Sequence, residues 1–173
     1  IQDALIVHWP DGIESKGEIR DQYHHISAMA PTLLDVSGLE VPDEIDGVKQ
    51  RPMDGVSMRY SFNDADAPNA KKVQYYEMFG NRGIWVDGWK AVTLHGKRMP
   101  WVLGTVSPFE TDEWELYHVA EDFSESTNLA EQYPEKLEEL IEIFDEEAVK
   151  YKVYPLYDDL IKRAVAQQDR WLP

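Results

Sequence analysis

Five histidines are the side chains best suited to acid–base or metal chemistry in this chain, and their spacing argues against a shared site. His24 and His25 are adjacent, and neighbouring side chains point apart on a helix or a strand, whereas residues four positions apart on a helix share a face. His8, His95 and His118 lie in strand-like stretches, where a structural role is the more common one. The histidines therefore predict no metal centre.

The acidic side chains give little further support for a metal site. Asp64-Ala65-Asp66 could offer carboxylate oxygens to calcium, but the segment lacks the glycine and the distal glutamate of a calcium-binding loop. Most other clustered acids fall within residues 135–147, on the polar side of a predicted helix. We therefore predict no metal ligands in this sequence.

Nucleophiles and anion-binding loops are also lacking in the sequence. It contains no Cys, no Gly-x-Ser-x-Gly segment and no Gly-rich phosphate loop. Lys71, Lys72 and Arg82 are plausible anion contacts, but each could equally be a surface charge. The formal net charge of −16 argues against nucleic-acid binding, because a free domain this acidic repels phosphate backbones. On these grounds alone the sequence indicates an α+β unit with no complete active site.

The first 70 residues resemble parts of a larger structure more than a closed domain. The apolar run Ala4–Trp9, followed by Pro10-Asp11-Gly12, predicts a strand buried on both faces of a parallel sheet. From about His25 to Val36 the apolar spacing is helical, with Gly38 as the expected C-cap. We expect residues 1–40 to be the remnant of a larger α/β domain, entered in mid-domain, and residues 41–70 to be a connecting segment.

The rest of the chain predicts a small antiparallel sheet packed by a long helix. The sheet strands are rich in β-branched and aromatic residues, and Asp87-Gly88 is a strong tight-hairpin signal. Pro134 suits the first helical position, and an apolar stripe continues to Lys150. No apolar run approaches the roughly 20 residues of a membrane span. The expected ranges are strands at 73–79, 83–86, 89–94 and 114–119, a turn at 80–82, a helix at 134–150, a subdomain at 71–151 and a tail at 152–173 with a short helix near 159–170.

Several segments, taken in order, resemble the C-terminal region of bacterial arylsulfatases, which are type I sulfatases of the alkaline-phosphatase-like superfamily. The resemblance covers nearly the whole chain. Its most specific part is YEMFGNR at 76–82 followed by DGWK at 87–90. That part lies within the matching segment DADAPNAKKVQYYEMFGNRGIWVDGWKAVTLH at 64–95. The other segments that carry the resemblance are ALIVHWPDGI at 4–13, KGEIRDQYHHISAMAPTLLDVSGL at 16–39, GVKQRPMDGVSMRYSF at 47–62 and the stretch 114–151 that begins WELYHV.

The resemblance implies sulfate ester hydrolysis by a formylglycine beside a calcium ion. The formylglycine of this family is made from the first residue of a Cys/Ser-x-Pro-x-Arg motif, and this chain has no such segment. The family's metal ligands and catalytic Lys and His lie mostly upstream of the part matched by Ala4–Trp9. The resemblance therefore implies a C-terminal fragment that is catalytically incomplete and binds no cofactor by itself. Its partners would be the missing N-terminal catalytic domain and, in the intact enzyme, a sulfate ester.

The resemblance also suggests roles for five residues of this chain. His24 and His25 match a His pair of the bacterial group and precede a helix expected near the catalytic face, so they are candidates for the substrate rim. Glu77, Asn81 and Arg82 are expected to tie the small sheet to the main domain. The family allows a periplasmic or secreted location, and composition does not fix the compartment.

An alternative from a different class is a free-standing module that binds carbohydrate or protein through exposed aromatic side chains. It predicts that Trp85, Trp89 and Trp114 lie partly exposed around one groove. It also predicts parallel partners for the Ala4–Trp9 strand within this chain, whereas a fragment would leave that strand unpaired. A second alternative is a degenerate homologue that serves as a scaffold. As a fragment, the chain would expose an apolar face and could self-associate.

Overall fold

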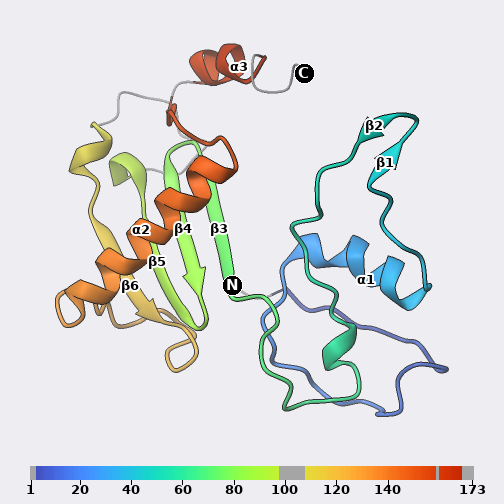
Figure 1. Cartoon of the computed structure of the whole chain (residues 1–173). Helices are drawn as coiled ribbons and strands as arrows, with labels where there is room; N and C mark the ends of the chain where they lie inside the picture. Colours follow the sequence, from blue (N-terminus) through green and yellow to red (C-terminus); the bar gives the residue numbers. More distant parts are fainter. Residues whose placement is uncertain (1–2, 98–107, 159, 169–173) are drawn as a thin grey trace. The chain divides into compact units, whose positions relative to one another are not determined.

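The chain divides into two compact units in a computed structural model that describes residues 3–97, 108–158 and 160–168 (Figure 1). The N-terminal unit comprises residues 1–71 and the C-terminal unit residues 72–173. Helices and antiparallel strands occur together, which confirms the predicted α+β class with a small antiparallel sheet packed against a helix.

The C-terminal unit contains a four-stranded antiparallel meander, as predicted. Its strands pair in the order β3-β4-β5-β6. Asp87-Gly88 forms a two-residue turn with φ angles of 44° and 96° at its two residues, both in the left-handed region that such tight hairpins require. The strand bounds are β3 Val73–Met78, β4 Asn81–Val86, β5 Trp89–Thr93 and β6 Trp114–His118.

The turn predicted at residues 80–82 lies earlier than expected. Phe79 and Gly80 form it, with φ angles of 51° and 88°. Asn81 pairs with Met78, and Arg82 with Glu77, in the antiparallel ladder. A two-residue turn with positive φ at both residues matches the twist of the flanking strands, so the ladder continues to its last possible pair. This register places Arg82 beside Glu77 on one face of the sheet.

Helix α2, Pro134–Lys150, crosses one face of this sheet and buries its apolar stripe there (Figure 1). Its bounds are those predicted from Pro134 and the apolar spacing. Leu140, Phe144 and Ala148 are completely buried against the sheet. Each large apolar side chain removed from water in this way contributes about 1.5–3 kcal/mol. The facing sheet residues, also completely buried, are Ile84, Ala91 and Leu116, and the unit further contains the 3-10 turns η3 His95–Lys97 and η4 Phe109–Thr111 and helix α3 Leu160–Gln168.

The N-terminal unit contains the helix predicted from the spacing between His25 and Val36. The helix begins with a 3-10 turn and continues as an α-helix, so Pro31 falls in the first α-helical turn, where it removes no helical hydrogen bond. Gly38 ends it with a φ of 67°, and the Leu39 N–H donates to the carbonyl of Leu34 (2.9 Å). The elements are η1 Ile26–Ala28, α1 Met29–Val36, β1 Glu44–Ile45, β2 Val48–Lys49 and η2 Arg59–Ser61.

The strand predicted at Ala4–Trp9 is wrong for this structure. These residues have no regular secondary structure, and the side chains of Leu5, Ile6 and Val7 are 51%, 91% and 43% exposed. A strand requires hydrogen-bonding partners along its edge, and no strand of the described residues pairs with this run. An apolar run alone therefore did not produce a strand.

Residues 41–70 are tied to the helix of their own unit. The Thr32 hydroxyl accepts a hydrogen bond from the Met58 N–H (2.9 Å) and donates one to the carbonyl of Ala28 (2.6 Å). Gly55 lies so close to the helix start that a Cβ there would be 1.9 Å from the carbonyl oxygen of Ser27. The buried core of this unit is small and consists of Ala28, Met58 and Phe62. Within the described parts of the chain, no helix is long and apolar enough to cross a membrane.

Candidate functional site

The adjacent His24 and His25 are held differently, although both lie just before η1. The His24 ring packs edge-on against Tyr60, with ring centroids 5.8 Å apart, and its Nε2 is 3.5 Å from the Ser61 hydroxyl. The Nδ1 of His25 accepts from the Ser27 N–H (3.3 Å) and so caps the first helical turn. The two imidazoles therefore form no shared site.

Burial lowers the pKa of both imidazoles, because a partly dehydrated ring resists becoming charged. For His25 the nearby Lys71 ammonium lowers the pKa further. Both rings are consequently biased towards their neutral form. Neutral imidazoles can hydrogen-bond an uncharged or anionic group, which is compatible with the predicted rim role but does not test it.

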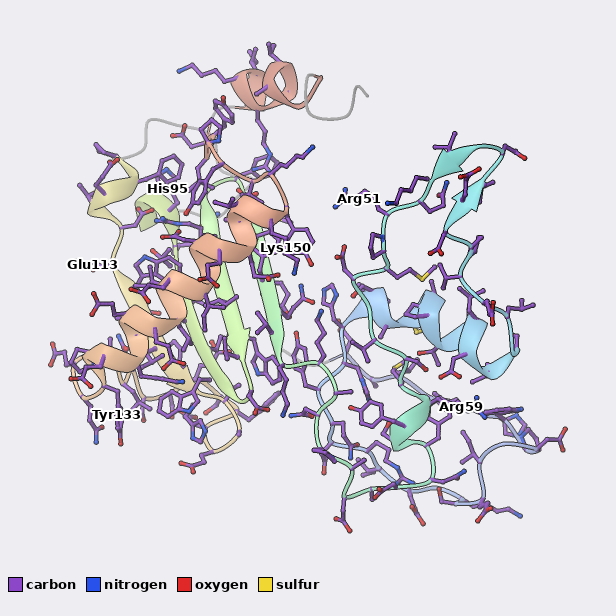
Figure 2. All side chains as sticks on the ribbon, in the orientation of Figure 1. Arg51, Arg59, His95, Glu113, Tyr133 and Lys150 are labelled. Carbon is purple, nitrogen blue, oxygen red and sulfur yellow. The ribbon has the colours of Figure 1, made fainter. Side chains whose placement is uncertain are left out.

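A second cluster of polar side chains lies at the end of the sheet nearest the β3–β4 turn. His95 is 1% exposed, and its Nδ1 lies 2.8 and 3.0 Å from the two carboxylate oxygens of Asp112. The imidazole stacks on Phe109, with ring centroids 4.0 Å apart. Glycine is the only residue type that fits at position 80 beside this stack, since a Cβ there would lie 2.8 Å from the His95 ring and 2.7 Å from the Phe109 ring. Figure 2 shows His95 at this end of the sheet.

Arg82 supplies the opposite charge for Asp112. Its guanidinium donates to the Asp112 carboxylate over 2.6 Å, with side-chain exposures of 11% and 2%. The same guanidinium lies over the rings of Phe109 and Trp114, 5.6 and 5.1 Å from their centroids. A nearly dehydrated ion pair between aromatic rings is rigid, so it fixes the start of β6 against β4.

Glu77 and Asn81 join this cluster through other partners. Glu77 is 3% exposed in its side chain and accepts two hydrogen bonds from the Arg163 guanidinium, over 2.8 and 2.7 Å. Asn81 accepts from the backbone N–H of His95 over 3.0 Å. Every hydrogen bond that the structure gives Glu77, Asn81 and Arg82 is to a residue of the C-terminal unit. Their predicted tie to a catalytic domain therefore stays a prediction.

Three members of this cluster were not singled out from the sequence. His95 was assigned a structural role, and Asp112 and Arg163 had no motif to identify them. His95 and Asp112 are separated by 17 residues and meet only because β5 and β6 are neighbours. The Asn81 and Arg82 positions within YEMFGNR were the available signal, since both contact this pair.

The three tryptophans expected around one groove do not share a face. In the ladder, Trp89 pairs with Val86 while Trp85 pairs with Lys90, so the two side chains point to opposite faces of the sheet. Trp114 packs against Phe144 of α2, and Trp85 is 5% exposed. The groove required by the binding-module alternative is therefore not formed.

The described residues do not fit the calcium site that the sulfatase resemblance implies. No three or more of their His, Asp and Glu side chains are arranged to hold a metal ion. In the Asp64–Asp66 segment, the Asp64 carboxylate instead accepts from the Asp66 backbone N–H over 3.0 Å. Of the basic candidates, Lys72 pairs with Asp87 over 3.0 Å, and Lys71 donates to the carbonyl of Asp54 over 3.1 Å.

Comparison with known proteins gives matches over most of the chain. The model of a family described as N-sulphoglucosamine sulphohydrolase, C-terminal, matches residues 1–153. The N-acetylglucosamine-6-O-sulfatase of Bacteroides thetaiotaomicron is 27% identical over 156 residues, which cover 86% of this chain and 25% of that protein. The chain thus spans about a quarter of the length of this relative.

Two solved structures match this chain, and the one with a TM-score above 0.5 shows a similar fold. That of Ps i-CgsB has a TM-score of 0.52 at 15% identity and is matched over 83% of this chain and 28% of its own. A structure solved in complex with its substrate D-glucosamine-2-N,6-O-disulfate has a TM-score of 0.48 at 23% identity, over 74% of this chain and 24% of its own. The first of these likenesses concerns the fold alone.

Proposed function

Because this chain belongs to the family of N-sulphoglucosamine sulphohydrolase C-terminal regions, we propose that it completes a sulfuric ester hydrolase whose nucleophile and metal are held by an N-terminal catalytic domain. In this proposal the chain covers one edge of that domain and shapes the substrate entrance. It has no turnover by itself, since a sulfuryl transfer needs an attacking oxygen and a cation to neutralise the sulfate oxygens. The sulfate ester would be that of an aryl or sugar compound.

The observation that carries this proposal is the exposed apolar surface of the N-terminal unit. Ala28 at the end of η1 and Thr32 of α1 are buried, while Ile26 of η1 and Leu33 of α1 are 77% and 61% exposed. Isolated soluble domains rarely leave so many large apolar side chains in water. Other large apolar side chains of this unit that are exposed are Leu5, Ile6, Ile19, Leu39, Ile45 and Val48.

The absence of parallel partners for Ala4–Trp9 points the same way. The run has the composition of a strand covered on both faces, yet no described strand pairs with it. In the proposed complete protein, the catalytic domain supplies the neighbouring strand and the covering side chains. A free-standing module would have to bury the apolar side chains of this run, and pair its backbone, within residues 3–71.

His24 and His25 are proposed as part of the substrate entrance. They sit at the start of the same helix whose outer side would meet the catalytic domain, and their lowered pKa keeps them neutral near pH 7. In this arrangement they would orient the substrate, and the reacting atoms would lie elsewhere. Replacing either should raise KM more than it lowers kcat.

Two measurements test the proposal. The purified chain should show no calcium-dependent hydrolysis of an aryl sulfate, and turnover by the chain alone would refute its catalytic incompleteness. In the complete protein, His24→Ala and His25→Ala should raise KM for the sulfate ester, while the matched control His118→Ala should not. An unchanged KM in both variants would remove the rim role but leave the family assignment intact.

A charged side chain introduced on α1 tests whether this helix is covered by the catalytic domain. Leu33→Glu in the complete protein should weaken its thermal stability and turnover, because the carboxylate would be buried against the catalytic domain. Val149→Glu is the control, since Val149 is an exposed apolar residue (67%) on α2 of the other unit. If Leu33→Glu behaves like this control, α1 does not face the catalytic domain.

A further inference from the structure

The imidazole of His24 is held by one of its nitrogens and open at the other. Its Nε2 is 3.5 Å from the Ser61 hydroxyl, and its ring packs edge-on against Tyr60. Nδ1 has no hydrogen-bond partner among the described residues, and it reaches solvent. Both contacts come from η2, so this short turn determines which nitrogen of His24 faces the protein and which faces outward.

The two η2 residues that hold this ring are themselves fixed. Ser61 is 2% exposed, and its carbonyl accepts from Nε of Arg20 over 2.6 Å. The Tyr60 hydroxyl accepts from the backbone N–H of Ala70 over 3.2 Å. A ring in contact with two such anchors has few alternative orientations, so Nδ1 of His24 keeps one direction.

The hydroxyl proton of Ser61 decides which nitrogen of His24 carries the hydrogen. The Ser61 oxygen lies 2.9 Å from the carbonyl of Met58, which can only accept, and this contact is shorter than the one to His24. The hydroxyl therefore donates to Met58 and turns a lone pair towards Nε2. Nε2 must then be the donor in their contact, which leaves the lone pair of the neutral ring on Nδ1.

An open acceptor discriminates between the groups of a sulfate ester. Sulfate oxygens only accept hydrogen bonds, so a lone pair on Nδ1 would repel them, whereas a hydroxyl or an amide N–H can donate to it. Burial lowers the pKa of His24, which keeps the ring in this neutral form near pH 7. The Nδ1 of the adjacent His25 is already engaged, because it accepts from the Ser27 N–H.

We propose that His24 accepts a hydrogen bond from an uncharged donor of the substrate, a hydroxyl or amide of the sugar that carries the sulfate ester, and that Ser61 sets the tautomer needed for it. This role presupposes the entrance role proposed above for His24. Recognition is then divided, since His24 binds the sugar while the catalytic domain binds the sulfate group. The substrate is accordingly a sulfated sugar with free hydroxyl or N-acyl groups, in preference to a simple aryl sulfate.

Long-range proton–nitrogen NMR of the purified chain, with nitrogen-15 in its histidines, tests the tautomer. At about pH 7.5, where a histidine of lowered pKa is neutral, Nε2 of His24 should be protonated and Nδ1 should not. The signals are assigned by their loss in His24→Gln. Ser61→Ala removes the acceptor of Nε2, and the two tautomers should then exchange. The Nδ1–H tautomer in the unchanged chain would overturn the proposed acceptor.

Kinetics of the complete protein test which group is recognised. The two probes are N-acetylglucosamine 6-sulfate and 4-nitrophenyl sulfate, of which only the first has hydroxyl and amide donors. His24→Ala should raise KM for the sugar ester about three- to tenfold, as expected for the loss of one hydrogen bond between uncharged groups, and should leave KM for the aryl ester within about twofold. Equal changes of KM for the two esters would overturn the sugar contact.

Two conservative variants sharpen this test. His24→Asn keeps an acceptor oxygen near the position of Nδ1 and should recover most of the affinity for the sugar ester, whereas the amide of His24→Gln lies near the position of Nε2 and should not. Equal KM values for these two variants would contradict a contact through Nδ1. An absence of turnover of both esters by the unchanged complete protein would instead refute the proposed function.

Discussion

The two units of this chain satisfy their apolar side chains to very different degrees. In the C-terminal unit, six residues of the sheet and α2 are completely buried in one cluster. In the N-terminal unit, the buried cluster has three members, while large apolar side chains such as Ile6 (91%), Ile26 (77%) and Leu33 (61%) remain exposed. The C-terminal unit thus has the larger buried core, and the exposed apolar side chains of the N-terminal unit are the ones that we propose to be covered by a catalytic domain.

The polar contacts of the two units differ in the same sense. At the sheet end of the C-terminal unit, Arg82 and Asp112 form a buried ion pair between aromatic rings. In the N-terminal unit, loop segments are attached to α1 by the hydrogen bond between Thr32 and Met58 and by the more exposed ion pair between Arg59 and Asp35 (53% and 38%). Removing a buried polar contact should therefore lower the free energy of unfolding more in the C-terminal unit than in the N-terminal unit. The larger core of the C-terminal unit should nevertheless keep it folded.

The largest expected effect is that of Phe144→Ala. Phe144 is completely buried and contacts the rings of Tyr75 and Trp114, so its removal leaves a cavity at the centre of the core. We expect the free energy of unfolding of the C-terminal unit to fall by about 3–5 kcal/mol. Urea denaturation followed by hydrogen exchange of β4 and α2 measures it, with exposed Val149→Ala as the control. A loss no greater than that of the control would contradict the central role of this core.

Asp112→Ala should have the next largest effect. It leaves the Arg82 guanidinium, 11% exposed, without its carboxylate and removes the hydrogen-bond partner of His95. We expect a loss of about 3 kcal/mol in the C-terminal unit, because a buried cation is left uncompensated. Asp87→Ala is the matched control, since Asp87 and Lys72 form an exposed pair (52% and 54%) that contributes less than about 1 kcal/mol. Equal denaturation midpoints for the two variants would show that the sheet-end pair is not structurally important.

Thr32→Val tests the N-terminal unit with a smaller change. Valine keeps the shape of threonine but leaves the Met58 N–H without its acceptor in a buried position. The unit should lose about 1–3 kcal/mol, measured as faster hydrogen exchange of residues 29–36 and 58–62. Thr32→Ser retains the hydroxyl and should restore most of the protection. If serine and valine behave alike, the methyl group matters and the hydrogen bond does not.

Mild acid should have the smallest effect, and it should act on the N-terminal unit. The pKa of His24 is lowered by burial, so in the unfolded chain the imidazole takes up a proton at higher pH than it does in the folded unit. Its contribution to stability is present above an unfolded pKa of about 6.5 and is lost as pH falls through the folded value. Hydrogen exchange of residues 26–36 between about pH 7.5 and 5.5 measures this loss, which His24→Gln should reduce. A stability of this unit that rises on acidification would contradict the direction of the shift.

Local patterns in the sequence predicted the C-terminal unit well. The apolar stripe after Pro134 fixed the bounds of α2, and Asp87-Gly88 fixed one turn of the meander. These signals work because helix and hairpin are determined by neighbours in the chain. The shifted turn at Phe79-Gly80 shows the limit, since a positive φ at a phenylalanine has no local sequence signal.

Long-range features could not be predicted in the same way. The composition of Ala4–Trp9 indicates what would surround it, but a strand forms only where a partner edge is present. The contact of His95 with Asp112 depends on which strands become neighbours, and that of Glu77 with Arg163 spans 86 positions of the sequence. The two substrate-rim candidates, His24 and His25, were identified only through the family resemblance, and their role stays a prediction.

The two-residue connections of the meander have a consequence for how this region can change in length. Side chains alternate between faces along every strand, so one residue added within β4 would turn Ile84 away from α2 and bring Trp85 towards it. Descendants of this sequence should therefore keep the spacing from Val73 to Thr93 unchanged, and gain or lose residues between Thr93 and Trp114, where none of the described residues is paired in a ladder. Length variation across related genes would then mark, without any structure, which stretches are paired.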